Sequence, residues 1–274
     1  MDDLPELLWT IGDYLRAWGF EVPEAVKQRD EREPGREQKT KFENKLYYAT
    51  RRYFSRLAAK AQRRLELHEI FYPRKAINLD EYIGADFFED EEFDAEVIRL
   101  LLQGVGEGAS LFSQEIGIPL DYSGINKKVL AWAKKQSGKI VRGVDKTSRE
   151  LIRQAVSLFV ETPGFTIGDV MRMLPFDEQR ALQIAVTETT RAYAKGNQLG
   201  AEQLKVEWPD VPVVEIWHTN NDDRVCPLCG PLDGTEVEQG SGFYEADDSG
   251  YQDGYPPFHV NCRCWTSYRT RIGE

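Results

Sequence analysis

Four cysteines and one histidine form the most chemically informative pattern in this chain. Cys226 and Cys229 lie in "DDRVCPLCG", and His259, Cys262 and Cys264 lie in "FHVNCRC". The sequence has 274 residues but only four cysteines and three histidines, so these two short stretches hold every cysteine. Thiolate and imidazole groups at such spacings are typical ligands of a tetrahedral Zn²⁺ ion, which needs four of the five donors.

The spacing within each cluster indicates how its ligands would be presented. A Cys-x2-Cys turn can direct both sulfurs toward one point, and on a strand Cys262 and Cys264 would leave the same face. The 32 residues between Cys229 and Cys262 contain few apolar side chains. We therefore expect a bound metal to supply stabilisation that burial cannot. Four cysteines make a complete ligand set, and His259 could replace Cys262 or Cys264, while His218 is expected on a strand beside Trp217.

Other chemistry for these residues is less consistent with the sequence. The first twenty residues contain no basic segment before an apolar run, so we expect no secretory leader and a reducing compartment without disulfides. Gly230-Pro231 disfavours the helix that follows a redox-active pair. A catalytic zinc needs an open position and a base, and Asp222, Asp223 and Asp233 lie where carboxylates usually form turns. We predict structural zinc, no catalytic residue and no enzyme activity, with a zinc-dependent hydrolase or nuclease as an alternative.

The elements that must position these clusters change character along the chain. Helical periodicity dominates residues 1–205, and β-branched, alternating segments follow. We expect an N-terminal arm and helices over 40–71, 91–112, 125–136, 147–165, 166–174 and 177–204, then strands over 211–219 and 261–271. The predicted fold class is α+β, a mainly α-helical body with a small C-terminal β-containing zinc-type unit. The predicted division is 1–38 (arm and linker), 39–164 (helical body) and 165–274 (C-terminal domain).

Charge is distributed unevenly in this acidic chain. The net charge of -11 argues against general binding to nucleic acid. Residues 39–64 are nevertheless strongly basic and residues 80–96 contain acids but no base, so the two blocks could pair within the fold or face two partners. A second basic cluster spans 127–142. The candidate nucleic-acid contacts are Lys45, Arg52, Arg56, Arg63, Lys134 and Lys135. No apolar stretch of about 18 residues is present, so no membrane partner is expected.

The helix over 177–204 carries a charged pair in "TETTRAYAKGN". Glu188 and Arg191 are three residues apart, which permits an ion pair. The simpler interpretation is a surface pair of little energetic value. The alternative is a buried Arg191 that joins the helix to the zinc unit.

Three separate segments follow one another along the chain: "TETTRAYAKGN", "WHTNNDDRVCPLCGPLDG" and "PPFHVNCRC". In this order they resemble the phage Mu F-like head-morphogenesis family, whose members are minor head proteins, and the resemblance covers about residues 165–270. Val260 stands where the family commonly has proline, which removes no candidate ligand. Besides the metal donors, the matching motif residues are Glu188, Arg191, Trp217, Asp222, Arg224 and Asp233.

The resemblance implies a minor capsid protein of a tailed phage that acts in head assembly. The expected partner is the portal protein, with the major capsid or scaffolding protein and packaged DNA as further partners. The expected location is the virion, inside the head near the portal, and the host cytoplasm during assembly. No toxin domain is expected, because the sequence ends ten residues after Cys264. A DNA-binding accessory protein inside the capsid, using the basic helical faces, is the alternative.

Overall fold

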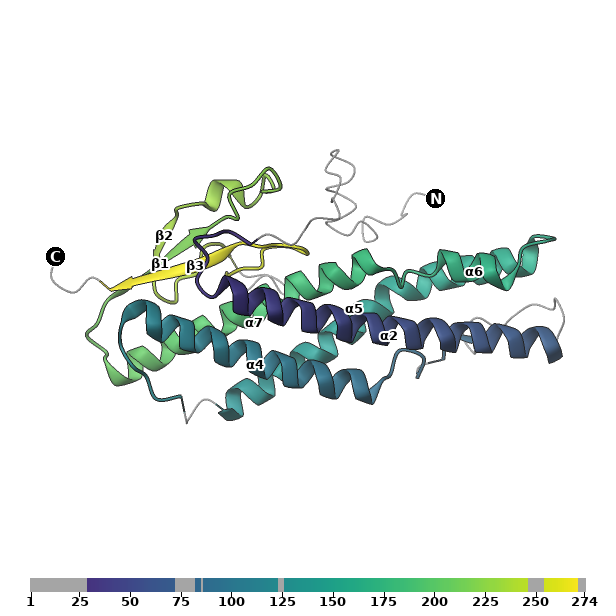
Figure 1. The fold of residues 1–274 in the computed structure, drawn as a ribbon, viewed down its shortest axis with the longest axis horizontal. Coiled ribbons are helices and arrows are strands. Elements are labelled where there is room, and N and C mark those ends of the chain that lie inside the picture. The colour runs from purple at the N-terminus through teal and green to yellow at the C-terminus, as the bar shows by residue number, and fades with distance from the viewer. Residues whose placement is uncertain (1–28, 72–81, 85, 123–125, 246–253, 271–274) are drawn as a thin grey trace. The chain divides into compact units, whose positions relative to one another are not determined.

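The structure, a computed structural model, describes residues 29–71, 82–84, 86–122, 126–245 and 254–270. Five helices, a short 3-10 turn and three strands appear there (Figure 1). The described residues are 62% helical and contain one small antiparallel sheet near the C-terminal end, which confirms the predicted α+β class. The predicted N-terminal arm lies outside the described residues. In chain order the elements are α2 (Arg36–Phe71), α4 (Glu91–Ile116), α5 (Asn126–Glu161), α6 (Ile167–Met173), α7 (Glu178–Glu207), β1 (Val213–His218), η1 (Gly230–Leu232), β2 (Glu236–Glu238) and β3 (Trp265–Thr270).

One helical boundary was predicted wrongly. Separate helices were expected over 125–136 and 147–165, but α5 is continuous. The polar residues that suggested the break bond within the fold instead: Ser137 Oγ donates to Asp94 Oδ1 at 2.7 Å, and Thr147 Oγ1 donates to the Gly143 carbonyl at 2.8 Å. The predicted cap of the last helix is correct, because Asp177 Oδ1 accepts from the Arg180 amide at 2.7 Å.

The chain forms two compact units, each built from separated segments. One unit comprises Met1–Leu46, Arg99–Ala133 and Gln183–Glu274, and the other comprises Tyr47–Ile98 and Lys134–Leu182. Helices α2, α4, α5 and α7 each contribute residues to both units. The three-part division at residues 38 and 164 stays a prediction.

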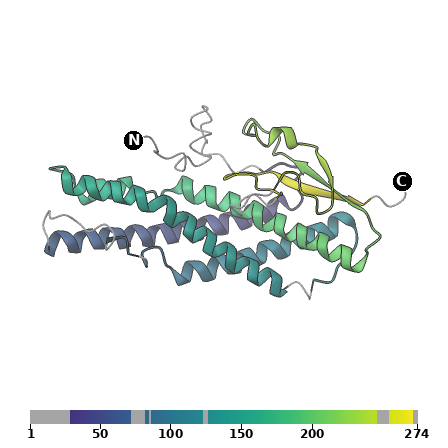
Figure 2. The same cartoon turned by 180° about the vertical axis from the view of Figure 1, so that it is seen from behind.

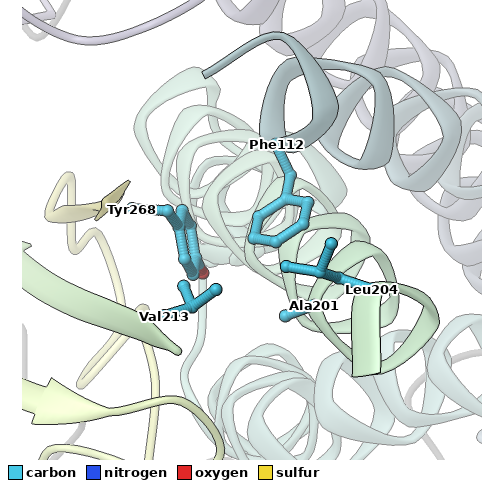
Figure 3. Close-up of a cluster of buried hydrophobic side chains, with 5 residues drawn as sticks. All are labelled: Phe112, Ala201, Leu204, Val213 and Tyr268. Atoms are coloured by element: carbon cyan, nitrogen blue, oxygen red, sulfur yellow. The ribbon is translucent and has the colours of Figure 1, made fainter. Parts of the chain in front are cut away.

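The unit that contains the C-terminus combines the sheet with α7. β1 is the central strand, with β2 and β3 antiparallel on either side, and the sheet lies next to α7 in both views (Figures 1 and 2). Figure 3 shows five buried side chains that point toward one another. The rings of Phe112 and Tyr268 meet edge to face at 4.8 Å. Contributed by α4, α7, β1 and β3, the five residues are Phe112, Ala201, Leu204, Val213 and Tyr268.

Glycines allow α4 and α7 to approach closely in the same unit. A Cβ atom added at Gly108 would lie 2.5 Å from the carbonyl oxygen of Tyr193. One added at Gly196 would lie 2.3 Å from the carbonyl oxygen of Val105. Any larger side chain would separate the two backbones, so these glycines fix how α7 packs.

The second unit pairs the two oppositely charged blocks. Arg56 forms a two-point contact with Asp90, with Nε to Oδ2 at 2.6 Å and a second nitrogen to Oδ1 at 3.0 Å. Arg52 lies 2.6 Å from Glu96. The predicted basic and acidic blocks therefore neutralise one another, in part, within the fold. Further pairs join Arg56 to Glu92 at 3.6 Å, and Asp86 to Lys60 at 3.8 Å and to Arg64 at 3.2 Å.

Candidate metal centre

The first half of the site is the turn between Cys226 and Cys229. Backbone amides of Cys229 and Gly230 both donate to the Cys226 carbonyl, at 3.1 and 3.0 Å. The Cys229 amide also lies 3.3 Å from the Cys226 sulfur. This turn runs directly into η1, whose first residues are Gly230 and Pro231. The tight turn holds both cysteines in the interior, where each side chain is buried.

The second half of the site lies in the segment before β3. The prediction that Cys262 and Cys264 occupy a strand is wrong, because β3 begins at Trp265. A turn precedes them, in which the Cys262 amide donates to the His259 carbonyl at 3.2 Å. Asn261 sits in the left-handed region at a φ of 67°, a conformation that asparagine tolerates better than most residues. This turn, rather than the alternation of a strand, directs the two sulfurs.

The two halves converge through His259. Its Nε2 atom lies 3.0 Å from the Cys226 sulfur and 3.3 Å from the Cys229 sulfur. The sulfurs of Cys229 and Cys262 are 3.9 Å apart. Two groups of donors, each within 4.8 Å of one another, share Cys229: one adds Cys226 and His259, and the other adds Cys262 and Cys264. Each group is therefore compact enough to hold a metal ion, and the shared Cys229 links the two groups.

The His259 ring is oriented so that Nε2 could bind a metal ion. Nδ1 faces the Val260 carbonyl oxygen at 2.7 Å, while Nε2 faces the sulfurs. With the proton on Nδ1, the Nε2 lone pair is available to an ion, and such a bond from the outer ring nitrogen is usual for metal-binding histidines. The donor chemistry and the ring orientation together fit a tetrahedral ion such as Zn²⁺.

The electrostatics of the cluster divide the four cysteines into two kinds, since the pKa values of Cys226 and Cys262 are lowered and those of Cys229 and Cys264 are raised. The hydrogen bond from Cys229 lowers the pKa of Cys226 to about 4. Burial opposes a charge on His259, but the nearby Cys262 and Cys226 sulfurs outweigh it and raise the pKa of His259 to about 9. The pKa of Cys229 is raised by its hydrogen bonds to Cys226 and Cys262. Without metal, an imidazolium therefore balances thiolate charge, and an ion would take over that role as the ring loses a proton.

Helix α7 holds the turn that carries the second group of donors. The Asn261 amide donates to Thr187 Oγ1 at 2.7 Å, and Thr190 Oγ1 donates to the Cys262 carbonyl at 2.9 Å. Thr190 was not predicted as a site residue, although its position three residues after Thr187 places both hydroxyls on one helix face. We call these two contacts the threonine clamp.

The charged pair of α7 is buried, so the interpretation of a surface pair is wrong. Glu188 and Arg191 are 4% and 5% exposed, with Oε2 and Nε 3.5 Å apart. The role of this pair in joining helix and metal centre stays a prediction.

The remaining motif residues build the turns around the cluster. Arg263 contacts both carboxylate oxygens of Asp222, at 2.8 and 3.0 Å, and Asp222 also accepts from the Arg224 amide at 3.1 Å. Asp233 accepts from the amide and the hydroxyl of Thr219, at 2.7 and 3.0 Å. Asp222 and Asp233 thus act as turn formers, and neither is placed as a free base.

The side chains of Trp217 and His218, neighbours on β1, have different surroundings. Trp217 is fully buried against the cysteines, with its ring 5.4 Å from that of Phe243. His218 lies at the end of β1, as expected, where it contacts Ser267 Oγ at 2.7 Å and stacks on Trp265 at 4.1 Å. Its side chain is engaged there and belongs to the sheet.

The structure separates the candidate nucleic-acid contacts into two kinds. Arg52 and Arg56 are engaged by acids, as described above. Lys45 is exposed and contacts Gln103 at 3.3 Å. The other three candidates are exposed and form no hydrogen bond or ion pair among the described residues. These are Arg63 on α2 and Lys134 and Lys135 on α5.

The fold and the cluster define a helical protein with a small C-terminal module built around a candidate metal centre. Residues 137–267 match the family model described as Phage Mu protein F like protein, which confirms the family resemblance over that segment. The match starts in α5, upstream of the segment that the motifs indicated, and covers just under half of the chain. It indicates a protein of phage head morphogenesis.

Two further comparisons gave no match, neither to a curated protein nor to a solved structure. None of the helices in the described ranges combines the length and apolar character needed to cross a bilayer.

Proposed function

We propose that this protein is a minor head component of a tailed phage that binds the portal vertex during assembly and has no catalytic role. One observation carries the proposal. The family-matched segment brings sulfur and imidazole donors from two turns, thirty or more residues apart in sequence, into one cluster whose cysteines are buried. A cluster of this kind stabilises a small module that has too little apolar surface of its own.

The ion that suits this cluster best is a structural Zn²⁺. Three thiolates and one imidazole form a closed tetrahedral set, whereas catalytic zinc keeps a position for water. The proposed ligands are Cys226, Cys229, His259 and Cys262, because the short sulfur–nitrogen and sulfur–sulfur distances join these four. Cys264 is then a buried neighbouring thiol.

The ligand set is tested by metal analysis of purified single variants. We expect about one zinc per wild-type chain, much less in His259→Ala, and an undiminished amount in Cys264→Ser. Loss of metal from Cys264→Ser with retention by His259→Ala would replace the proposed set by four cysteines. Substitution with Co²⁺ tests the closed site, because a bound water would favour the hydrolase or nuclease alternative.

The partner is tested with the portal protein encoded in the same phage genome. We expect the purified full-length chain to co-purify with portal rings under mild conditions, and to assemble into virions inside the head. The portal is the partner that the resemblance implies. Failure to co-purify, with the chain folded and metal-loaded, would count against portal binding while leaving the metal centre standing.

A further inference from the structure

Residues 29–33 lie far outside the family-matched segment, yet they contact the module after α7. These residues, named here the strap, precede α2 and pass next to the sheet in both views (Figures 1 and 2). The strap, the beginning of α2 and the candidate metal centre all belong to the unit that contains the C-terminus. Their contacts can therefore be followed from one side chain to the next.

Four buried charges fasten the strap to α2. Arg29 donates to Glu33 at 3.1 Å and to Glu43 of α2 at 2.9 Å, and Lys39 of α2 donates to Glu33 at 2.8 Å. None of the four residues is more than 7% exposed, and their two positive and two negative charges balance. Removing one partner from such a buried set is strongly destabilising. Docking of the strap therefore depends most on Glu33, which binds both cations.

Polar contacts also join the strap to the first half of the metal centre. The Asp30 amide donates to Asn220 Oδ1 at 2.9 Å, and Asn220 Nδ2 donates to Asp222 Oδ2 at 2.9 Å. Asn220 is buried, which shields both bonds from water. Asp222 is held in turn by Arg263, which belongs to the second half of the centre. A chain of contacts thus runs from the strap to both turns that carry the donors.

The strap approaches the second half of the centre directly as well. Glu33 and Lys39 line a small cavity together with Cys264 and the first residues of β3. The Lys39 ammonium group lies 5.3 Å from the centre of the Tyr193 ring on α7. The strap, α7 and the turn before β3 therefore meet at one place, and a movement of that turn changes the surroundings of the strap.

We propose that docking of the strap and binding of the metal ion are coupled, so that each strengthens the other. This coupling rests on the structural ion of the proposed function and extends it to residues outside the family-matched segment. An ion that fixes both turns holds Asn220 and Arg263 in place, and the docked strap keeps the turns in the arrangement that binds the ion. By thermodynamic linkage, the ion stabilises docking by the same factor by which docking raises metal affinity. The ion thereby fixes Arg29, the position at which residues 1–28 join the described part of the chain.

The first experiment measures strap docking in the full-length wild-type protein with and without metal. Metal analysis first establishes that the purified protein contains zinc. Hydrogen exchange read by mass spectrometry then follows the backbone amides of residues 29–35, among them the Asp30 amide that contacts Asn220. We expect removal of zinc by a chelator to speed their exchange about tenfold. The amides of residues 185–194, in the buried part of α7, should keep their protection.

The second experiment releases the strap and measures metal affinity. Glu33→Gln deprives Arg29 and Lys39 of the carboxylate that they share. Glu31→Gln is the matched control, because it removes the same charge from a strap side chain that is 92% exposed. In competition with a chelator of known affinity, we expect Glu33→Gln to bind zinc about tenfold more weakly and the control to match the wild type. Circular dichroism checks that both variants keep the wild-type helical content.

The possible outcomes distinguish a failure of the coupling from a failure of the proposed function. Absence of metal from the folded wild-type protein would refute both. Metal binding would stand without the coupling if strap exchange did not respond to zinc removal, or if Glu33→Gln bound zinc as tightly as the wild type. A loss of affinity in Glu31→Gln as large as in Glu33→Gln would trace the effect to charge instead of docking, and would also overturn the proposal.

Discussion

The unit that contains the C-terminus is held together in two different ways. Where α4 meets α7, glycines let backbones touch and an apolar cluster fills the contact. In the module after α7, the buried centre consists of four cysteines around Trp217. The first region is stabilised by packing, and its geometry cannot change without strain. The module after α7 depends on cysteine and histidine donors, which repel or attract one another according to their protonation and to any bound ion. Its stability therefore depends on pH and on metal concentration.

The change expected to destabilise the protein most acts on the module after α7 and leaves the α4–α7 contact intact. Cys229→Ser removes the donor that both groups share, and we expect a loss of several kcal/mol from the module, since metal binding free energy is folding free energy there. Trp217 fluorescence should change strongly because the ring packs on the cysteines, while far-ultraviolet helicity persists. Leu228→Ser is the matched control, because that side chain is 48% exposed between the two cysteines. An unchanged Trp217 signal in metal-free Cys229→Ser would contradict the dependence on donors.

A second change destabilises the contact between α4 and α7. Gly196→Ala would place a methyl group against the Val105 carbonyl, and we expect a loss of about 3 kcal/mol from overpacking. Gly106→Ala on the same face-to-face helix pair is the control, because its Cβ would meet nothing within 4 Å. That control should gain up to about 1 kcal/mol from helix propensity. Urea denaturation followed by circular dichroism measures both changes, and similar values for the two variants would rule out the close contact.

How well the sequence predicts each region follows from the range of its interactions. The donors stand out because five rare residues occupy two short stretches, and the helices stand out because α2 buries residues at helical spacing, Phe42 and Leu46 among them. The continuous α5 could not be predicted, because Ser137 meets its partner Asp94 more than forty residues away. The threonine clamp could not be predicted either, since it joins positions 187 and 261.

Patterns in the local sequence also gave wrong predictions for the residues around the candidate ligands. Alternation around Cys262 and Cys264 suggested a strand, but the backbone there bonds to Thr190 and turns at Asn261 instead. The spacing of Glu188 and Arg191 correctly predicted an ion pair, but it carries no information about whether the pair is buried. Both errors concern what lies opposite a residue in space, and only long-range packing decides that.

The buried Glu215 side chain makes the stability of the sheet depend on pH. Glu215 of β1 is 1% exposed and its Oε2 has no hydrogen-bond partner among the described residues. Burial raises the pKa of Glu215 from 4.5 to about 7. The folded state therefore holds the proton more tightly than the unfolded state, and stability falls as pH rises from about 4.5 to about 7.

Glu215→Gln should remove this cost because the amide copies the protonated carboxyl. We expect the variant to exceed the wild type by up to about 3 kcal/mol at pH 8 and to equal it near pH 4. Part of the pH dependence should remain, because burial also raises the pKa of Glu115 to about 7. Thermal unfolding at several pH values measures the difference, and a gap that is constant with pH would refute the assignment.

The smallest effect tests whether α7, a packed element, also positions the donors. Thr187→Val leaves the Asn261 amide without its acceptor, which should cost about 1 to 2 kcal/mol and loosen the turn before Cys262. Thr187→Ser restores the hydroxyl and should behave as the wild type. The readout is the rate at which a chelator removes metal, because a general loss of stability in the helices would leave that rate unchanged in native conditions. Faster removal from Thr187→Val alone would tie the two regions together, and equal rates in all three proteins would show that α7 supports the module without positioning its ligands.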